Sequence, residues 1–345
     1  MTKFKAGTWR LSIFISIIAM SFLAQQTKIT KVQPSWSPTK ATLVSSQNSF
    51  IPRPLALASR HGVILGSYPQ LWYSPLNLQP MVPGSSTSEG TWQPIGTSAG
   101  SGNATFATYV TPYPGAPQVA VAWINQAQAS LSLFAGTSQP GGSNWPNEGS
   151  IPPTLYPTLI AAFEGGFIFN QSHGGWYQAG SYGSPLLYGA ASIVNYTNGT
   201  INIGSWGNEV AMASNVYAVR QNLIPLVENS TVTTAANVDP LITWGYSLGN
   251  LIYTWRSGLG ITANGDLIWV GGPGLSPQAL GNVLVWAGSV RGMQLDMNPD
   301  WVNYASYTYN AGSGISGQNL LASMHFPPSH YLSPFWRDFM GVFLR

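Results

Sequence analysis

SGLGITANGDLIWVGG, residues 257–272, contains two apolar segments separated by Asn264-Gly265. An Asn-Gly pair between alternating apolar residues is a strong short-range signal for a β-hairpin, because both residues tolerate the positive φ angles of tight turns. The stretch therefore predicts two antiparallel strands. The same signal occurs at Asn198-Gly199 within ASIVNYTNGTINIGSWG, residues 191–207, and predicts a second hairpin.

The best helix signal of the chain follows the first hairpin, in LSPQALGNVLVWAGSV, residues 275–290. Ser276 suits the N-cap position and Pro277 suits the first helical position. Apolar residues then recur at helical spacing: Leu280, Val283, Leu284 and Ala287. We expect a helix over 276–288, followed by a strand over 290–298.

Further short apolar or alternating runs predict the remaining strands. They are TFATYVTPY (105–113), QVAVAWI (118–124), ASLSLFAG (129–136), TLIAAFEGGFIF (158–169) and VYAVRQNLIPLVEN (216–229). Strands at this short spacing with few helical segments predict the α+β class, with a mixed, mainly antiparallel β-sheet core and a few packed helices.

Charged residues form only 7% of the chain, far below the share of about 25% typical of soluble domains. Eight of the 13 basic residues precede His61, so the rest of the chain has no basic stripe that could neutralise a nucleic-acid backbone. The chain has no cysteine, which excludes disulfides, thiol catalysis and cysteine–metal sites. A chain of 345 residues is long enough to be stabilised by a large hydrophobic core instead.

The N-terminal region predicts export. Residues 1–24 combine a basic start with an apolar run, which is typical of a signal peptide or of an uncleaved membrane anchor. Residues 25–60 are polar and contain several prolines, so we expect a linker there, followed by one domain over 61–345. The expected location is secreted or extracytoplasmic, with membrane contact through the N-terminal segment only.

Six segments of this domain occur in the order and at the approximate spacing found in the phosphodiester glycosidase family. They are AAFEGGF (161–167), GGWY (174–177), AVRQNLIPLVEN (218–229), WRSGLGITANGDLIWV (255–270), LSPQALGNVLVWAG (275–288) and MQLDMN (293–298). The chain resembles this family from about Glu89 to Tyr309. The resemblance implies hydrolysis of a sugar-1-phosphodiester.

The chain departs from the family pattern at two motifs. Glu164 stands where the family usually has the Asn of an Asn-Gly-Gly-Phe motif. The family's Leu-Asp-Gly-Gly-Gly-Ser motif is replaced by LDMNPD, residues 295–300, which keeps Asp296 but lacks the glycines. The chain therefore resembles a divergent branch of the family.

Cleavage at an anomeric carbon requires a carboxylate, a cation for the phosphate and a group that moves protons. Asp296, between two apolar residues at a predicted strand end, is the first candidate for nucleophile or general base. A structural role, capping the turn at Asn298-Pro299, is the alternative. Arg256 and Arg220 lie in apolar, strand-like segments, where an arginine is expected either to bind the phosphate or to form a core ion pair with Glu164 or Asp296. An active-site or substrate contact is favoured for Arg256, a candidate catalytic residue, whereas for the candidate substrate-binding residue Arg220 the two roles are equally open.

Glu164 is the candidate for the second catalytic carboxylate, with a structural turn residue as the alternative. Gly165 and Gly166 would let a substrate approach the backbone, and Asn222 and Asn298 are candidates for binding sugar hydroxyls. One or two of the aromatic residues are expected to stack on a sugar ring, from a set comprising Trp176, Tyr177, Trp206, Trp244, Trp255 and Trp301.

The sequence predicts no metal site and no cofactor. Its four histidines lack zinc-ligand spacing, and a Ca²⁺ ion near Asp296 and Asn298 has no specific support. The leading hypothesis is an exported glycosidase that hydrolyses sugar-1-phosphodiester linkages of cell-envelope or extracellular polysaccharide. The alternative is a non-catalytic glycan-binding or surface-structural protein on the same scaffold.

Overall fold

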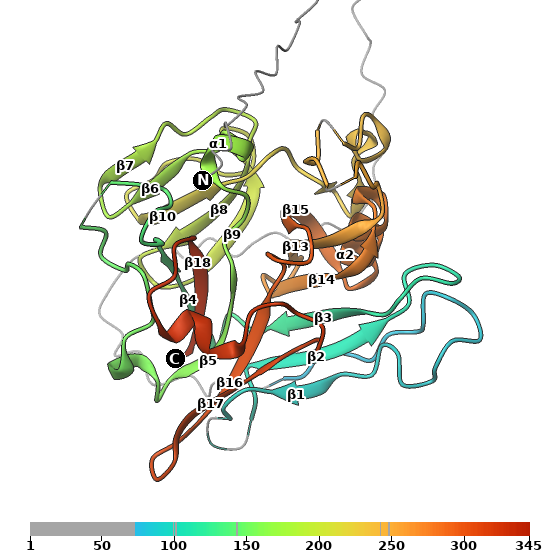
Figure 1. Ribbon diagram of the computed structural model, residues 1–345, viewed down its shortest axis with the longest axis horizontal. Helices are drawn as coiled ribbons and strands as arrows, with labels where there is room; N and C mark the ends of the chain where they lie inside the picture. The colour runs from blue at the N-terminus through green and yellow to red at the C-terminus, as the bar shows by residue number, and fades with distance from the viewer. Residues whose placement is uncertain (1–72, 99, 101, 143, 242, 248) are drawn as a thin grey trace, which may run out of the picture. The chain divides into compact units, whose positions relative to one another are not determined.

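The hairpin predicted around Asn264-Gly265 is present at the centre of the largest sheet (Figure 1). The structure is a computed structural model, and it describes residues 73–98, 100, 102–142, 144–241, 243–247 and 249–345. Strands β13 (Thr254–Thr262) and β14 (Leu267–Leu275) pair in antiparallel register on either side of the turn. Gly265 adopts a φ of +89°, as the turn requires.

Eight strands of the described residues form this sheet, in the order β1-β2-β3-β14-β13-β15-β11-β12. The remaining strands are β1 (Gln93–Ile95), β2 (Thr105–Val110), β3 (Val119–Ile124), β15 (Ser289–Met297), β11 (Val227–Glu228) and β12 (Thr231–Val232). Strand β15, which ends just after Asp296, pairs with β13 on one side and with β11 on the other.

Two five-stranded sheets complete the architecture within the described residues. One has the order β7-β6-β10-β8-β9, with β7 (Ser181–Ser184), β6 (Trp176–Gln178), β10 (Val216–Gln221), β8 (Ala191–Tyr196) and β9 (Ile201–Ser205). The other has the order β17-β16-β5-β18-β4, with β17 (Gly314–Asn319), β16 (Tyr304–Asn310), β5 (Leu159–Glu164), β18 (Phe339–Leu344) and β4 (Ala129–Phe134). The turn of the β8–β9 hairpin contains Asn198-Gly199, as predicted.

The predicted helix is confirmed as α2 (Pro277–Trp286). The Ser276 side chain accepts a hydrogen bond from the Ala279 amide at 3.1 Å, and Pro277 occupies the first turn. The other helical segments are short: α1 (Phe169–Ser172) and the 3₁₀ turns η1 (Pro153–Leu155), η2 (Thr234–Asn237) and η3 (Pro328–Leu332).

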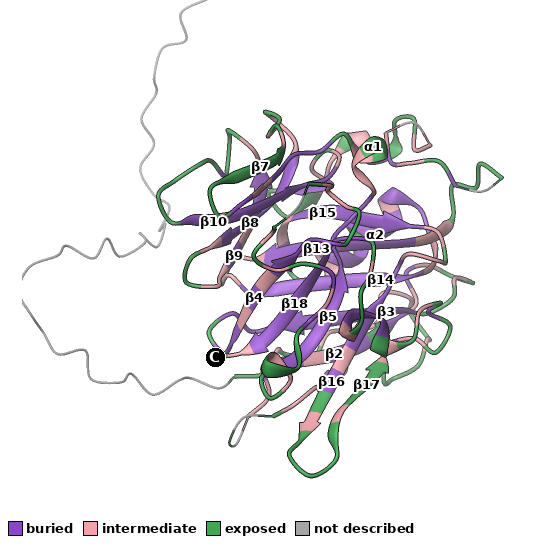
Figure 2. Cartoon of the chain, turned by 60° about the vertical axis from the view of Figure 1, so that its left-hand side comes forward, coloured by how far each residue is buried: buried purple, intermediate pink, exposed green. Residues whose placement is uncertain are grey.

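The large sheet is buried on both faces, which explains its nearly continuous apolar sequence (Figure 2). In β3 the six residues are all buried, and they alternate between two cores. Val119, Val121 and Trp123 pack in the core that contains α2. Ala120, Ala122 and Ile124 pack in a second core shared with both five-stranded sheets.

The predicted core of mainly antiparallel sheet with few helices is confirmed, but the class is mostly β rather than α+β. Every pairing between the named strands of the described chain is antiparallel, and the helices are few and short. No helix of the described residues is long and apolar enough to cross a membrane. The predicted leader or anchor (1–24), the linker (25–60) and the first residues of the predicted domain lie outside the described residues.

Candidate functional site

Glu164, the candidate for the second catalytic carboxylate, is the last residue of β5 and is 6% exposed. Strand β5 pairs there with β18, where Glu164 lies opposite Phe339, and the Gly165 amide donates to the Asp338 carbonyl at 3.0 Å. Glu164 Oε2 accepts a hydrogen bond from the Asn303 amide at 3.1 Å. Its Oε1 has no hydrogen-bond partner within the described part of the chain. A buried carboxyl oxygen without a partner is costly unless the group is protonated or binds something.

Asp296, the first candidate for nucleophile or general base, lies near the end of β15 and is 1% exposed. Its Oδ1 accepts from the Met297 amide at 2.8 Å, and its own amide donates to Ser257 Oγ at 3.2 Å. Its Oδ2 forms an ion pair with Arg337. The Asp296 carboxylate is therefore bound by a cation as well as by the Met297 amide.

Arg337 is the functional candidate that the sequence reasoning missed. It precedes β18 and is 5% exposed, and its Nη2 donates to both the Gly166 carbonyl, at 2.7 Å, and Asp296. The guanidinium lies 4.5 Å from the Trp301 ring and 5.5 Å from the Trp336 ring, distances typical of cation–π contact. Arg337 has the same sequence signal as Arg220 and Arg256, because FWRDF, residues 335–339, also places an arginine in an apolar segment of a charge-poor chain.

A second buried ion pair joins Arg220 of β10 to Asp338. Arg220 Nε lies 2.8 Å from Asp338 Oδ2, and Nη2 lies 3.3 Å from Oδ1, a two-point contact that fixes both groups. The same guanidinium donates to the carbonyls of Gln221 and Phe167 and lies 4.0 Å from the Phe169 ring. Of the two outcomes expected for Arg220, the structure therefore contains the core ion pair, although its partner is Asp338.

The two glycines allow these groups to come together. A side chain at Gly165 would place its Cβ 2.0 Å from Asp338 Oδ2. Gly166 has a φ of +144°, and a Cβ there would lie 3.2 Å from Asn222 Cγ and 3.4 Å from Arg220 Nη2. Both positions thus require glycine to admit charged and amide groups against the backbone.

Asn222 connects this cluster to β15. Its Nδ2 donates to the carbonyls of Gln294 at 2.7 Å and Leu295 at 2.8 Å, which fixes the strand just before Asp296. Its Oδ1 has no hydrogen-bond partner among the described residues. Asn298 follows β15 with a φ of +75° and donates its amide to the Trp255 carbonyl at 2.9 Å.

The two carboxyl groups differ in their electrostatic surroundings. Burial raises the pKa of Glu164 to about 8; the Asp296 carboxylate adds to the rise, while Ser257 and the Asn303 amide oppose it. Burial also raises the pKa of Asp296, but the Arg337 guanidinium beside it favours the ionised form. Burial thus raises the pKa of both carboxyl groups, and only Asp296 has a guanidinium group, that of Arg337, directly beside it.

Arg256 lies apart from this cluster in its contacts. Its guanidinium donates to the Leu275 carbonyl at 3.1 Å, the Trp244 carbonyl at 2.9 Å and Gln294 Oε1 at 3.0 Å, and it has no carboxylate partner among the described residues. Burial lowers its pKa to about 10. Successive side chains of a strand point to opposite faces, so the next residue, Ser257, contacts the Asp296 amide while Arg256 does not.

The candidate aromatic residues separate into core and surface groups. Trp176 and Trp244 are fully buried and pack in the cores. Trp301 is half-buried, covers Arg337 and contacts the Trp336 ring edge-on at a centroid distance of 5.5 Å. Trp336 is 37% exposed, so the Trp301–Trp336 pair is one place where the ion-pair cluster approaches solvent.

The cluster as a whole is closed: Glu164, Asp296, Arg220, Arg337 and Asp338 are all buried. Within the described ranges, no group of three or more His, Asp or Glu side chains is arranged to hold a metal ion. The arrangement brings together Glu164, Asp296, Arg220, Asn222 and both glycines, and it adds Arg337 and Asp338. Its chemical capacity is that of three carboxyl groups, one of them with a pKa raised to about 8, and two guanidinium groups within one network.

No protein-family model and no curated protein matches the sequence. Among solved structures, the chain is similar to the catalytic domain of zebrafish N-acetylglucosamine-1-phosphodiester alpha-N-acetylglucosaminidase auto-inhibited by its pro-peptide, with 13% identity and a TM-score of 0.42 over 74% of this chain and 87% of that chain. It is also similar to a hypothetical protein from Synechocystis, with 11% identity and a TM-score of 0.41 over 70% of this chain and 62% of that chain. The function proposed below depends on the side chains of this chain.

Proposed function

We propose that the chain is an exported glycosidase that hydrolyses sugar-1-phosphodiester linkages, with Glu164 and Asp296 as its catalytic carboxyl groups. The observation that carries the proposal is the buried pair itself: Glu164 with a pKa raised to about 8 by burial, coupled to an Asp296 that is paired with Arg337. Two carboxyl groups in different environments, one without a cationic partner and one beside a guanidinium group, are suited to the separate acid and base roles of glycosyl transfer.

In this proposal Glu164 is the general acid. It donates its proton to the bridging oxygen as the bond between the anomeric carbon and that oxygen breaks, so the aglycone leaves as a phosphomonoester. A water molecule supplies the new oxygen on the anomeric carbon, with Asp296 either as the base that takes its proton or as the nucleophile of a preceding step. Arg337 and Arg220 balance the phosphate charge.

The substrate would reach the cluster past Trp301 and Trp336. Trp336 is partly exposed, and both rings cover the Arg337 guanidinium that pairs with Asp296. An aromatic surface next to a cation suits a sugar that carries a phosphate, because the ring faces pack on the pyranose while the cation binds the anion. The proposed location is extracytoplasmic, which agrees with the leader-like residues 1–24 and with a polysaccharide substrate of the envelope.

One observation favours the second candidate, a non-catalytic glycan-binding or surface-structural protein. Glu164 and Asp296 are 6% and 1% exposed, and Asp296 is fully engaged by Arg337 and the Met297 amide. A purely structural network of two ion pairs would have the same buried contacts as a catalytic site without substrate. The glycosidase therefore requires the Trp301–Trp336 surface to open when a substrate binds.

The test uses the full-length chain with the methyl phosphodiesters of glucose-1-phosphate and N-acetylglucosamine-1-phosphate. Release of reducing sugar together with the methyl phosphomonoester is the expected result. Asp296→Asn should lower the rate by about a thousandfold or more, because it removes a group that takes part in bond breaking. Glu164→Gln should also abolish turnover, and the wild-type rate should fall as pH rises through about 8, where Glu164 loses its proton.

Asp266→Asn is the matched control, because Asp266 is a buried carboxyl group outside the cluster, bound by the Tyr73 hydroxyl at 2.6 Å. Both variants are expected to be less stable, and assays are run well below both melting temperatures. Asp266→Asn should retain most of the turnover. Equal losses in the two variants, or inertness of the wild type on both substrates, would support the non-catalytic alternative.

A further inference from the structure

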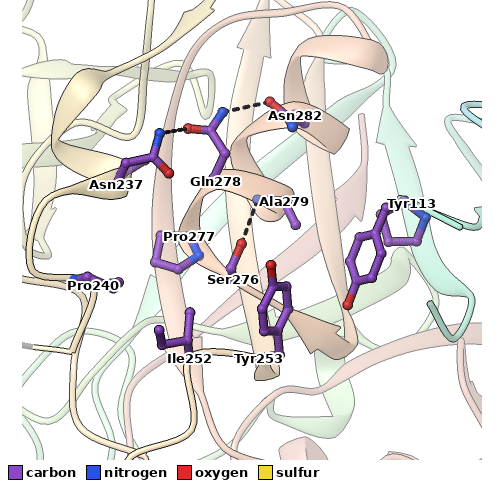
Figure 3. Close-up of a pocket in the computed structure, with 12 residues that line it drawn as sticks. Tyr113, Asn237, Pro240, Ile252, Tyr253, Ser276, Pro277, Gln278, Ala279 and Asn282 are labelled. Carbon is purple, nitrogen blue, oxygen red and sulfur yellow. Dashed lines mark hydrogen bonds between the residues drawn. The ribbon is translucent and has the colours of Figure 1, made fainter. Parts of the chain in front are cut away.

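A separate cavity of about 430 Å³ opens at the N-terminal end of α2 (Figure 3). Its walls come from four places far apart in the sequence: Tyr113, Asn237 at the end of η2, the 252–253 segment before β13, and residues 276–282 at the start of α2. A cavity of this size falls in the range that holds small ligands. None of the residues of the carboxylate cluster lines it.

Two tyrosines form one wall. The rings of Tyr113 and Tyr253 lie with centroids 5.6 Å apart and planes at 63°, so they make a corner of two aromatic surfaces. Tyr113 is fixed by its hydroxyl, which donates to the Gly274 carbonyl at 2.7 Å. Tyr253 is 57% exposed, and the neighbouring Ile252 is 41% exposed. A large exposed aromatic next to a cavity offers a flat apolar face that nothing in the described chain covers.

The opposite wall is a chain of side-chain amides. Asn237 Nδ2 donates to Gln278 Oε1 at 2.8 Å, and Gln278 Nε2 donates to Asn282 Oδ1 at 2.8 Å (Figure 3). Because the bonds run in one direction, the Asn237 carbonyl oxygen is left as an acceptor at one end and the Asn282 amino group as a donor at the other. Neither has a hydrogen-bond partner among the described residues. A hydroxyl group both donates and accepts, so it can use either end.

The cavity carries no formal charge. No Asp, Glu, Lys, Arg or His lines it. The helix end is already capped, since Ser276 Oγ accepts from the Ala279 amide at 3.1 Å, and Pro277 has no N–H to offer. These features make the cavity a poor match for a phosphate or carboxylate and a good match for a polyhydroxylated neutral ring.

Arg256 positions both walls from behind. Its Nη2 donates to the Ile252 carbonyl at 3.4 Å, next to Tyr253, and its Nε donates to the Leu275 carbonyl at 3.1 Å, next to Ser276. One rigid guanidinium thus links the aromatic wall to the start of α2. This gives the buried arginine a role outside the carboxylate cluster.

We infer that this cavity is a binding subsite for an uncharged pyranose unit of a glycan, stacked on Tyr253 and hydrogen-bonded by the amides of Asn237, Gln278 and Asn282. The inference does not depend on the proposed hydrolysis, because a neutral sugar subsite serves an enzyme and a non-catalytic glycan-binding protein equally. In either case it would hold a sugar unit away from the Asp296 cluster.

The test is a ligand-observed NMR titration of the full-length chain with maltose, cellobiose and N,N′-diacetylchitobiose. Saturable binding of at least one of them is expected. Tyr253→Ala should weaken binding by about tenfold, as the loss of one aromatic stacking surface predicts. Gln278→Ala, as a separate variant, should also weaken binding, because it breaks the amide chain between Asn237 and Asn282. Tyr188→Ala is the matched control, since Tyr188 is 77% exposed and does not line the cavity.

Binding should be unchanged between about 0.05 and about 0.5 M NaCl, because no charge takes part. It should also persist in Asp296→Asn, which separates this subsite from the hydrolytic proposal. The inference is overturned if none of the three disaccharides binds, if Tyr253→Ala binds as tightly as wild type, or if Tyr188→Ala loses as much affinity. A steep loss of affinity with salt would also overturn it, since it would indicate an anion site.

Discussion

Replacing Glu164 by Gln should make the protein more stable at high pH and remove a large part of its pH dependence. Burial raises the pKa of Glu164 from 4.5 to about 8 in the folded chain, so the folded state keeps a proton that the unfolded chain has lost. The stabilisation from this group is complete below pH 4.5 and is lost as pH rises through about 8. Each pKa unit corresponds to about 1.4 kcal/mol, so the loss of unfolding free energy caused by this group between low and high pH is roughly 5 kcal/mol at most. Gln resembles the protonated carboxyl group and does not titrate.

The assay is chemical denaturation of wild type and Glu164→Gln at a series of pH values from 4.5 to 8.5, with the difference in unfolding free energy as the readout. Other titrating groups contribute to both proteins and largely cancel in the difference. Glu148→Gln, which changes an exposed carboxyl group, is the control and should leave the pH profile of wild type unaltered. If the difference between wild type and Glu164→Gln stays constant across this range, Glu164 is ionised in the folded protein and its assignment as an acid fails.

Three further predictions concern stability. Arg337→Gln should lower the unfolding free energy by about 3–5 kcal/mol, because it leaves Asp296 buried without its cation. Adding Asp296→Asn should recover part of that loss. Strictly additive effects of the two substitutions would contradict the pairing. Gly165→Ala should lower the melting temperature by an amount equivalent to about 1–3 kcal/mol, because its Cβ would meet Asp338 Oδ2, and wild-type stability would contradict the close approach. Ser276→Ala should lower the unfolding free energy by about 1 kcal/mol, because α2 loses its N-cap hydrogen bond. Ser276→Asp should retain most of the wild-type stability, because Asp is also a good N-cap residue.

The local features of the fold could be predicted from the sequence. The hairpins at Asn198-Gly199 and Asn264-Gly265 and the helix after Ser276 all have their signals within a few neighbouring residues. The short apolar runs predicted strands and few helices, as found, but the helices of the described chain are so short that its class is mostly β rather than α+β. The strand β3, apolar throughout, is buried on both faces because α2 covers one face of its sheet and the smaller sheets cover the other.

The sequence by itself determined which chemical groups this protein has: few charges, no thiol, and carboxylates and arginines placed in strand-like apolar segments. Only the tertiary structure decided which of them meet. Asp296 pairs with Arg337, 41 residues further along the chain. Arg256 instead donates hydrogen bonds to backbone carbonyl groups, among them those of Leu275 and Ile252 beside the second cavity. The physical reason is that turns and helix caps depend on contacts between near neighbours, whereas a side chain's face depends on strand register. The β13–β15 register shifts by a bulge between Arg256 and Gly258, and no pattern in either strand alone reveals that shift.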